Sequence, residues 1–360
     1  MNEIKIINPS LDDNGRLQEF YARIYRPDHV LVNDTFLRWW LHDNPYYAGS
    51  GFSCKIAVDG SKIIGHFAYV PVNIWSRGSL YKGAWTGNFI VDEVYRGKGV
   101  GGLLIKSIMD EQQATMDVGA NVLAEEVLQK KGWTHFGNLH RFVGIFNERE
   151  AAPLAIEKEA PGYCLIRVPE AQNNQMTIIS EVAAFSNDYD VFWEKFRQGI
   201  SAATDRTAKF LNWRYAKHPL FHYRLLEAKT DGQTRGIAVF RIDPIKDMEQ
   251  SAARIVEFIA EPEIEEPLLE RALECAKEEN AILADFFCAS EKFGAVFEKF
   301  GFCGRPYSNQ IARLFSPIVL SPREISFNGA NCRNELPKDT FQNQELWYVT
   351  SGDGDQDRPN

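Results

Sequence analysis

The chain has 360 residues, enough for two domains, and its 44% hydrophobic and 25% charged residues are ordinary for a globular protein. A formal net charge of −9 argues against a nucleic-acid partner and against an anionic membrane surface. No apolar run is long enough to span a membrane, the N-terminus lacks a signal-peptide pattern, and the six cysteines form no Cys-x-x-Cys pair, so we expect a cytoplasmic protein without a zinc site.

Up to residue 92, the spacing of apolar residues predicts helices and the strands of a mixed sheet. Helices are expected over residues 11–25 and 36–45, and strands over 3–7, 54–58, 63–73 and 79–92. The Asp59-Gly60 pair lies between two of these strands and predicts a hairpin turn. The last strand delivers the chain to a glycine-rich segment.

That segment joins a strand to a helix. It follows the apolar run Phe89, Ile90 and Val91 and precedes a helical pattern that reaches about Gln113. It consists of Arg96, Gly97, Lys98, Gly99, Val100, Gly101 and Gly102. With so few Cβ atoms, several N–H groups can point at one place, and the helix N-terminus adds free N–H groups and the positive end of its dipole. Together with the two cations, they predict a pyrophosphate site.

We expect neither a dinucleotide-binding loop nor a P-loop, the latter because no Gly-Lys-Ser/Thr follows a four-residue gap. The spacing Arg-x-x-Gly-x-Gly, from Arg96 to Gly101, resembles the coenzyme A loop of the GNAT superfamily of N-acyltransferases. The resemblance implies that the loop holds the pyrophosphate of an acyl-CoA and that no metal is needed. The other interpretation is an ordinary basic turn.

A second match to the superfamily follows the loop. A short strand near residues 116–119, a helix over 121–131 and a closing strand over 133–146 are expected. The series Asn121, Ala124, Leu128 and Gly132-Trp133 has the family spacing Asn-x-x-Ala-x-x-x-Tyr-x-x-x-Gly-Phe. The resemblance places Asn121 beside the pantetheine or the phosphates. Leu128 departs from the family, in which a tyrosine there often protonates the departing thiolate.

The remaining chain repeats this pattern. Residues 151–175 are rich in Glu, Ala, Pro and Asn and are predicted to link two domains. Phe210-Leu-Asn-Trp213 then repeats Phe36-Leu-Arg-Trp39, each followed by a proline six residues later. Repeats on this scale are whole domains. We therefore expect an α/β (mixed α+β) fold of two tandem GNAT-like domains, over 1–150 and 176–360, each with a mixed, largely antiparallel central sheet flanked by helices.

One part of the repeat is missing from the second copy. In place of the basic, glycine-rich loop it has Glu261–Pro267, with four carboxylates and two prolines. Carboxylates repel a pyrophosphate and prolines lack N–H donors. Only the first copy is therefore predicted to bind CoA, and the second is expected to be a scaffold and one wall of the acceptor site.

The resemblance implies a reaction that works by bringing two reactants together. The acyl-pantetheine is expected to lie like an added strand between splayed strands, with a backbone N–H within Phe89–Val91 holding the oxyanion. Glu125 is the first candidate for the base that deprotonates the amine, and His135 and His140 are alternatives. The other interpretations are a solvated helix face, packed histidines, or a route through water without a dedicated base.

The acceptor is predicted from overall layout. Two domains with one CoA loop resemble bacterial enzymes that N-acylate nucleotide-linked amino sugars, including dTDP-3-amino-3,6-dideoxyhexoses, from acetyl-CoA or 3-hydroxybutyryl-CoA. Side chains that could stack on a base or bind phosphates are Trp39, Trp40, Trp213, Arg214 and Tyr307, although matching tryptophans are also typical packing residues. The alternatives are another small amine (an aminoglycoside, amino acid or polyamine) or a non-catalytic CoA-binding regulator. A monomer or small homo-oligomer is expected.

The C-terminal tail after Trp347 carries three alternating aspartates, Asp353, Asp355 and Asp357. This series resembles the start of a calcium loop, but Arg358 stands where that loop requires a glycine. We expect no calcium. The tail is either a polar segment held by Trp347 or an acidic arm that faces a cationic amine.

Overall fold

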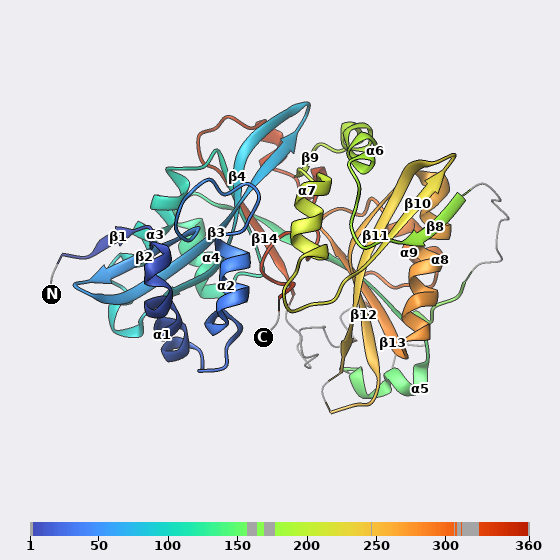
Figure 1. Cartoon of the computed structure of the whole chain (residues 1–360), viewed down its shortest axis with the longest axis horizontal. Helices are drawn as coiled ribbons and strands as arrows, with labels where there is room; N and C mark the ends of the chain where they lie inside the picture. Colours follow the sequence, from blue (N-terminus) through green and yellow to red (C-terminus); the bar gives the residue numbers. More distant parts are fainter. Residues whose placement is uncertain are drawn as a thin grey trace.

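The computed structural model of the chain describes residues 3–156, 164–168, 177–245, 247–305, 307, 311 and 324–358. Two mixed β-sheets lie side by side, each flanked by helices (Figure 1). This arrangement confirms the predicted fold class. Of the predicted linker over 151–175, residues 157–163 and 169–175 lie outside the described part.

The first sheet contains most of the strands of the N-terminal half. Across the sheet they are β1 (Lys5–Ile7), β2 (Cys54–Asp59), β3 (Lys62–Ser76), β4 (Ser79–Val91), β5 (Ala114–Val118), β14 (Ser326–Asn331) and β6 (Thr134–Asn138). The short strand β9 (Ala202–Thr204) pairs with β3, and β15 (Trp347–Tyr348) pairs with β9. The helices of this half are α1 (Asn14–Ile24), α2 (Asp34–Leu41), α3 (Val100–Met109) and α4 (Val122–Gln129).

The second sheet repeats the centre of the first. Across the sheet its strands are β7 (His140–Ile145), β13 (Ala281–Cys288), β12 (Ser251–Ala260), β11 (Gln233–Pro244), β10 (Arg224–Thr230) and β8 (Thr177–Glu181). The helices after residue 147 are α5 (Glu148–Ala151), α6 (Asp188–Phe196), α7 (Ala208–Leu211), α8 (Pro262–Glu278) and α9 (Gly294–Lys299). Strands β10 to β13 pair antiparallel, antiparallel and parallel, as β2 to β5 do.

The two halves exchange a strand. The predicted closing strand over 133–146 is in fact two strands, because β6 stays in the first sheet and β7 pairs with β13 in the second. In return, β14 from the C-terminal part lies between β5 and β6. A division of the chain at residue 150 therefore does not coincide with the division into sheets. An alternating pattern specifies the buried face of a strand and not its partner, so the sequence could not show the exchange.

The repeated tryptophans meet between the sheets, where α2 and α7 approach each other (Figure 1). The indole N–H of Trp39 donates to the carbonyl of Trp213 at 3.1 Å, and the indole N–H of Trp213 donates to the carbonyl of Trp39 at 3.2 Å. Their rings stack with centroids 5.2 Å apart. Such a reciprocal contact is the signature of two equivalent surfaces related by a two-fold axis.

Candidate functional site

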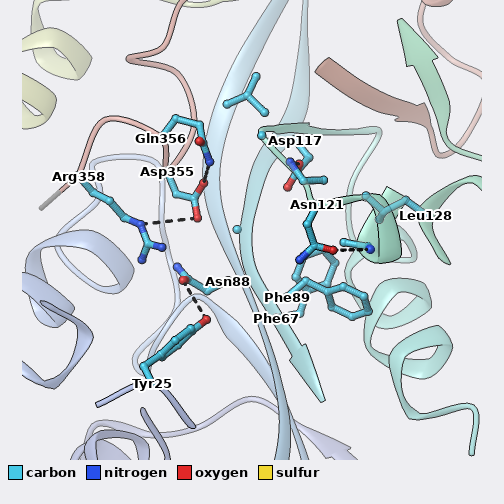
Figure 2. Close-up of a pocket in the computed structure, with 15 residues that line it drawn as sticks. Tyr25, Phe67, Asn88, Phe89, Asp117, Asn121, Leu128, Asp355, Gln356 and Arg358 are labelled. Carbon is cyan, nitrogen blue, oxygen red and sulfur yellow. Dashed lines mark hydrogen bonds and ion pairs between the residues drawn. The ribbon is translucent and has the colours of Figure 1, made fainter. Parts of the chain in front are cut away.

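Strands β4 and β5 separate in the centre of the first sheet. They pair in parallel only from Gly83 to Trp85 on β4 and from Ala114 to Met116 on β5. Beyond that point a cavity of about 340 Å³ opens between them (Figure 2). We call this gap the N-terminal fork. It is the splayed arrangement that the sequence predicted for the pantetheine.

A β-bulge shapes the β4 side of the fork. Gly87 pairs with Ala68 and Ile90 with His66, so β4 has one more residue than β3 over this stretch, and Asn88 has a positive φ of 50°. The ring Nδ1–H of His66 donates to the carbonyl of Asn88 at 3.1 Å. Such bulges redirect backbone groups away from the strand ladder, here at the wall of the cavity.

A second hydrogen bond holds the ring of His66 on the side away from Asn88. Its Nε2 accepts a hydrogen bond from the hydroxyl of Tyr21 at 2.7 Å. Because the carbonyl of Asn88 can only accept, the proton of the neutral ring lies on Nδ1. The imidazole is fully buried, and burial lowers the pKa of His66 to about 4. His66 therefore supports the bulge as a neutral donor.

This burial predicts a loss of stability in acid. Below pH 6.5 the unfolded chain protonates His66, whereas the folded protein does so only near pH 4. The contribution of this group is complete above pH 6.5 and is lost as the pH falls, by up to about 1.4 kcal/mol per pH unit. In urea unfolding, His66→Gln should flatten the fall in unfolding free energy between pH 6.5 and 4. The exposed His222→Gln is the control, and equal slopes for both variants would contradict the assignment.

The glycine-rich loop lies between the end of β4 and the start of α3. Gly97 and Gly99 have φ values of +74° and +83°, which side-chain-bearing residues rarely adopt. Gly99 caps α3, so the free N–H groups of its first turn follow directly. A Cβ on Gly101 would lie 2.9 Å from the ring of Phe89, which lines the cavity. The loop thus adjoins the fork.

Two further features indicate which ligand this loop can bind. A Cβ on Gly102 would lie 2.9 Å from the ammonium of Lys131, so a third cation stands at the first turn of α3 beside Arg96 and Lys98. Gly97, Gly99 and Gly102 also have the spacing Gly-x-Gly-x-x-Gly, so spacing alone does not exclude a dinucleotide. The sheet favours another diphosphate ligand, because dinucleotide loops belong to mostly parallel sheets, whereas β4 lies antiparallel to β3 and parallel to β5 over only three residue pairs.

The other wall of the fork leads into α4. Asn121 is the N-cap of this helix, and its Oδ1 accepts from the N–H of Ala124 at 2.9 Å. Asn121, Ala124 and the buried Leu128 all line the cavity. The first three residues of the quoted series therefore face the fork, whereas Gly132 and Trp133 do not line it, and Leu128 has no hydroxyl in place of the family tyrosine.

The structure does not place the three predicted bases in the cavity lining. Glu125 lies 3.9 Å from His135, and His135 also contacts Asn328, but neither Glu125 nor His135 lines the cavity. His140 lies on β7 in the second sheet and contacts Glu345 at 2.7 Å. Spacing along α4 could not show which of its faces looks into the fork.

The predicted acceptor residues are mostly interior. Trp39, Trp40, Trp213 and Arg214 are between 3% and 6% exposed, so their rings offer no open face to a base. The guanidinium of Arg214 donates to backbone carbonyls of the tail. Tyr307 is exposed and does not line the cavity. Trp39 and Trp213 therefore join the two halves, Arg214 holds the tail, and Trp40 is a core residue that packs on Phe36.

Two carboxyl groups that the sequence did not single out as bases do line the cavity. Asp117 comes directly after the last paired residues of the fork and is 6% exposed. Burial, and then the nearby charge of Asp355, raise the pKa of Asp117 to about 8. A lone aspartate in the apolar strand Ala-Thr-Met-Asp-Val was the available signal.

Asp355 reaches the fork on the C-terminal tail. A Cβ on Gly87 would lie 2.7 Å from the Asp355 carboxylate, and a Cβ on Gly119 would lie 2.2 Å from the amide carbon of Gln356. The tail therefore touches both walls of the fork. Figure 2 shows Asp355, Gln356 and Arg358 on one side of the cavity and Asp117 on the other.

The neighbouring aspartates of the tail anchor it. Asp353 pairs with Arg206, and Asp357 pairs with Arg241 and accepts from the hydroxyl of Tyr223. These groups are almost fully buried. The first and third aspartates of the series thus fix the tail to the C-terminal half, and the second faces the fork.

The matching gap in the second sheet is closed by the chain itself. Strands β12 and β13 pair in parallel only as far as Ile255 and Phe286. Beyond them, the hydroxyl of Tyr348 donates to the carbonyl of Phe258 at 2.9 Å and accepts from its N–H at 3.3 Å. Helix α8 begins two residues after β12 ends, so no loop corresponds to residues 96–99.

The described residues contain neither a membrane-spanning helix nor a group of metal ligands. No helix among them is long and apolar enough to cross a membrane. Within the same part of the chain, no group of three or more His, Cys, Asp or Glu side chains is arranged to hold a metal ion.

Known structures share this architecture. A GCN5-related N-acetyltransferase from Anabaena variabilis ATCC 29413 aligns with a TM-score of 0.63 and 11% identity, over 92% of this chain and 73% of that one. Another from Kribbella flavida gives 0.54 and 12%, over 91% and 71%. A conserved protein of unknown function from Enterococcus faecalis V583, called a probable N-acyltransferase, gives 0.57 and 10%, over 84% and 70%.

No protein-family model matches the sequence, and no curated protein is similar to it. At 10–12% identity, the likeness to the three solved structures establishes the fold alone. Over most of its length, the chain has the fold of GCN5-related N-acetyltransferases.

Proposed function

We propose that the protein is an acyl-CoA-dependent N-acyltransferase whose reaction takes place in the N-terminal fork. The observation that carries this proposal is the cavity between β4 and β5, together with the glycine loop before α3, which adjoins the cavity where Gly101 lies close to Phe89. A strand gap beside a basic, glycine-rich helix N-terminus suits a ligand with an extended amide arm and a diphosphate end. The fold of the similar structures supports the same interpretation.

The residues present fit the diphosphate of CoA. Gly97 and Gly99 have positive φ values, Gly99 caps α3, and the first turn of that helix leaves backbone N–H groups available to phosphate oxygens. Lys131 lies beside Gly102 in the first turn of α3, and Arg96 and Lys98 add two further cations within the loop. The pantetheine would extend from this loop along the fork, so its thioester end lies toward Asp117, where the strands converge.

The chemistry would be direct attack of a neutral amine on the thioester. Holding the two reactants in line supplies up to about 7–11 kcal/mol of the barrier reduction. A backbone donor at the bulge of Phe89 would add about 2.7–4 kcal/mol by stabilising the oxyanion. Leu128 cannot protonate the leaving thiolate, so that proton comes from solvent or from another group.

The acceptor has two candidates. Overall layout favours a nucleotide-linked amino sugar such as a dTDP-3-amino-3,6-dideoxyhexose, with an acetyl or 3-hydroxybutyryl donor. The two carboxyl groups that line the cavity, Asp117 and Asp355, favour another small amine. A screen with mass detection separates them: acylation of the sugar nucleotide alone supports the first, and acylation of free amines alone supports the second.

The same screen tests the activity itself. Thiol release from acetyl-CoA or 3-hydroxybutyryl-CoA should require an amine and yield an acylated product. Binding of CoA without amine-dependent thiol release would identify a CoA-binding regulator instead.

The gap between β12 and β13 is closed by the chain, so we expect each chain to bind one CoA. The hydroxyl of Tyr348 makes hydrogen bonds with the backbone N–H and carbonyl of Phe258, which are then not available to a ligand. Glu263 and Glu265 lie in the first turn of α8, where their carboxylates repel phosphates. Calorimetric titration with CoA should therefore give a stoichiometry near one. Glu263→Lys should leave that stoichiometry unchanged, and two equal sites in the unmodified protein would contradict the asymmetry between the forks.

A further inference from the structure

The thioester end of the N-terminal fork is acidic and assembled from both halves. Asp117 comes from β5, and its two oxygens accept from the hydroxyl of Thr86 at 3.2 Å and from the N–H of Ala120 at 3.1 Å. Asp355 comes from the tail and is 9% exposed. Both line the same cavity from opposite sides (Figure 2). Two carboxyl groups with little water between them attract a cation.

A neighbouring donor at the wall of the cavity is available to a ligand. Asn88 is 9% exposed, and its Nδ2 has no hydrogen-bond partner among the described residues. Its Oδ1 accepts from the hydroxyl of Tyr25 at 3.4 Å, which turns the amide nitrogen toward the cavity (Figure 2). A buried donor without a partner is costly, so a ligand oxygen at this position would satisfy it.

Resting on the proposed function, we propose that the acceptor is a small amine that enters as an ammonium ion between Asp117 and Asp355, and that Asp117 takes its proton. The Nδ2 of Asn88 then donates to the carbonyl oxygen of the thioester. The C-terminal tail is thus part of the acceptor site of the N-terminal half. This assignment replaces Glu125, His135 and His140 as the base.

The protons and electrons balance in this scheme. The ammonium gives one proton to the carboxylate of Asp117, and the freed lone pair attacks the thioester carbon. The C–N bond forms, the C–S bond breaks, and the electron pair leaves on the CoA sulfur. The nitrogen loses a second proton, which neutralises the thiolate, and Asp117 later returns its proton to solvent.

The charges around Asp117 determine the pH range in which it can act as the base. Burial and the negative charges of Asp355 and Glu125 raise its pKa to about 8. Tyr25 adds no charge, since burial raises its pKa, and Arg358 lies 3.9 Å from Asp355 and partly offsets that carboxylate. A base with a pKa near that of an ammonium ion transfers protons more effectively than an ordinary carboxylate.

The test compares Asp117→Asn and Asp355→Asn with Asp28→Asn, whose carboxylate is exposed and outside the cavity. The first readout is carboxyl-carbon NMR of the protein without CoA, with the Asp117 signal identified by its loss in Asp117→Asn. This signal should titrate near pH 8, and roughly one unit lower in Asp355→Asn because a neighbouring negative charge is gone.

The second readout is acetyl transfer to 1,4-diaminobutane. Asp117→Asn should lower kcat/KM by about 100-fold or more. Asp355→Asn should raise the KM for the diamine about tenfold and shift the acidic limb of the pH profile downward, in step with the NMR titration. Asp28→Asn should behave like the unmodified protein in both readouts.

Several results would overturn the proposal. One is an Asp117 NMR signal whose titration is the same in Asp355→Asn as in the unmodified protein. The others are full activity in Asp117→Asn and the absence of transfer to 1,4-diaminobutane at pH 9 by protein that binds CoA. Calorimetric titration with CoA distinguishes failure of the proposed function from failure of the acceptor assignment. Unmodified protein that binds no CoA refutes the proposed function, whereas CoA binding without transfer to the diamine refutes only the acceptor assignment.

Discussion

Replacing Gly99 by valine should reduce CoA affinity by about 100-fold. Gly99 has a φ of +83°, where a β-branched residue carries roughly 1–3 kcal/mol of strain, so the loop must rearrange. Rearrangement moves the N–H groups before α3 away from the phosphates, and each charge-assisted hydrogen bond contributes about 1.5–3 kcal/mol. Two tenfold steps of affinity correspond to about 2.8 kcal/mol. Calorimetric titration with CoA measures the change.

The matched control is Gly232→Val. Gly232 has a φ of +76° in the turn between β10 and β11, and like Gly99 it has open space around its Cα. Both variants should lose similar stability, but only Gly99→Val should lose CoA binding. Equal CoA affinity in the two variants would refute the assignment of the loop.

Replacing Arg206 by methionine should lower the unfolding free energy by about 3–5 kcal/mol. Arg206 is fully buried, and its Nε lies 3.0 Å from both oxygens of Glu257 while its Nη2 pairs with Asp353. Without the guanidinium, two carboxylates remain buried with no cation of their own. Lowering the pH from 7 toward 5 should narrow this loss of stability, because burial raises the pKa of Glu257 and that carboxylate can then take up a proton in the folded variant. Urea unfolding measures both effects.

Arg224→Met is the matched control. Arg224 also pairs with two carboxylates, Glu181 and Glu279, each at 2.7 Å. Those carboxylates are about half exposed, at 46% and 48%, so water replaces the lost partner, and the expected loss is about 0–1 kcal/mol. Comparable losses for the two arginine variants would contradict the view that buried ion pairs fix the tail.

The conformation of the glycine-rich loop follows from its local chemistry, and its CoA-binding role stays a prediction. The glycines at 97 and 99 were needed for positive φ, and the cations beside them favoured an anion, so the residues and their backbone conformation agree. The repeat was also visible, because Trp39 and Trp213 carry out the same packing role in both halves. These features depend on residues close together in the chain or on a copied segment.

The meeting of two carboxyl groups at the fork was not predictable in the same way. Asp117 and Asp355 are far apart in sequence and meet only because the tail crosses from one half to the other. The tail was expected to be either a polar segment held by Trp347 or an acidic arm facing an amine. The structure shows Trp347 buried and Asp355 at the fork, so the two alternatives are compatible.

The strand exchange was missed for a related reason. Residues 133–146 alternate enough to suggest one closing strand, and this pattern does not specify that the chain leaves one sheet for the other near Leu139. Pairing across sheets is decided by tertiary packing.

The most direct measurement is a crystal structure of the protein with acetyl-CoA. The pyrophosphate should lie against the N–H groups at the start of α3, the pantetheine should extend between β4 and β5, and the acetyl group should end beside Asp117 and Asp355. CoA bound between β12 and β13, or outside either fork, would contradict the account.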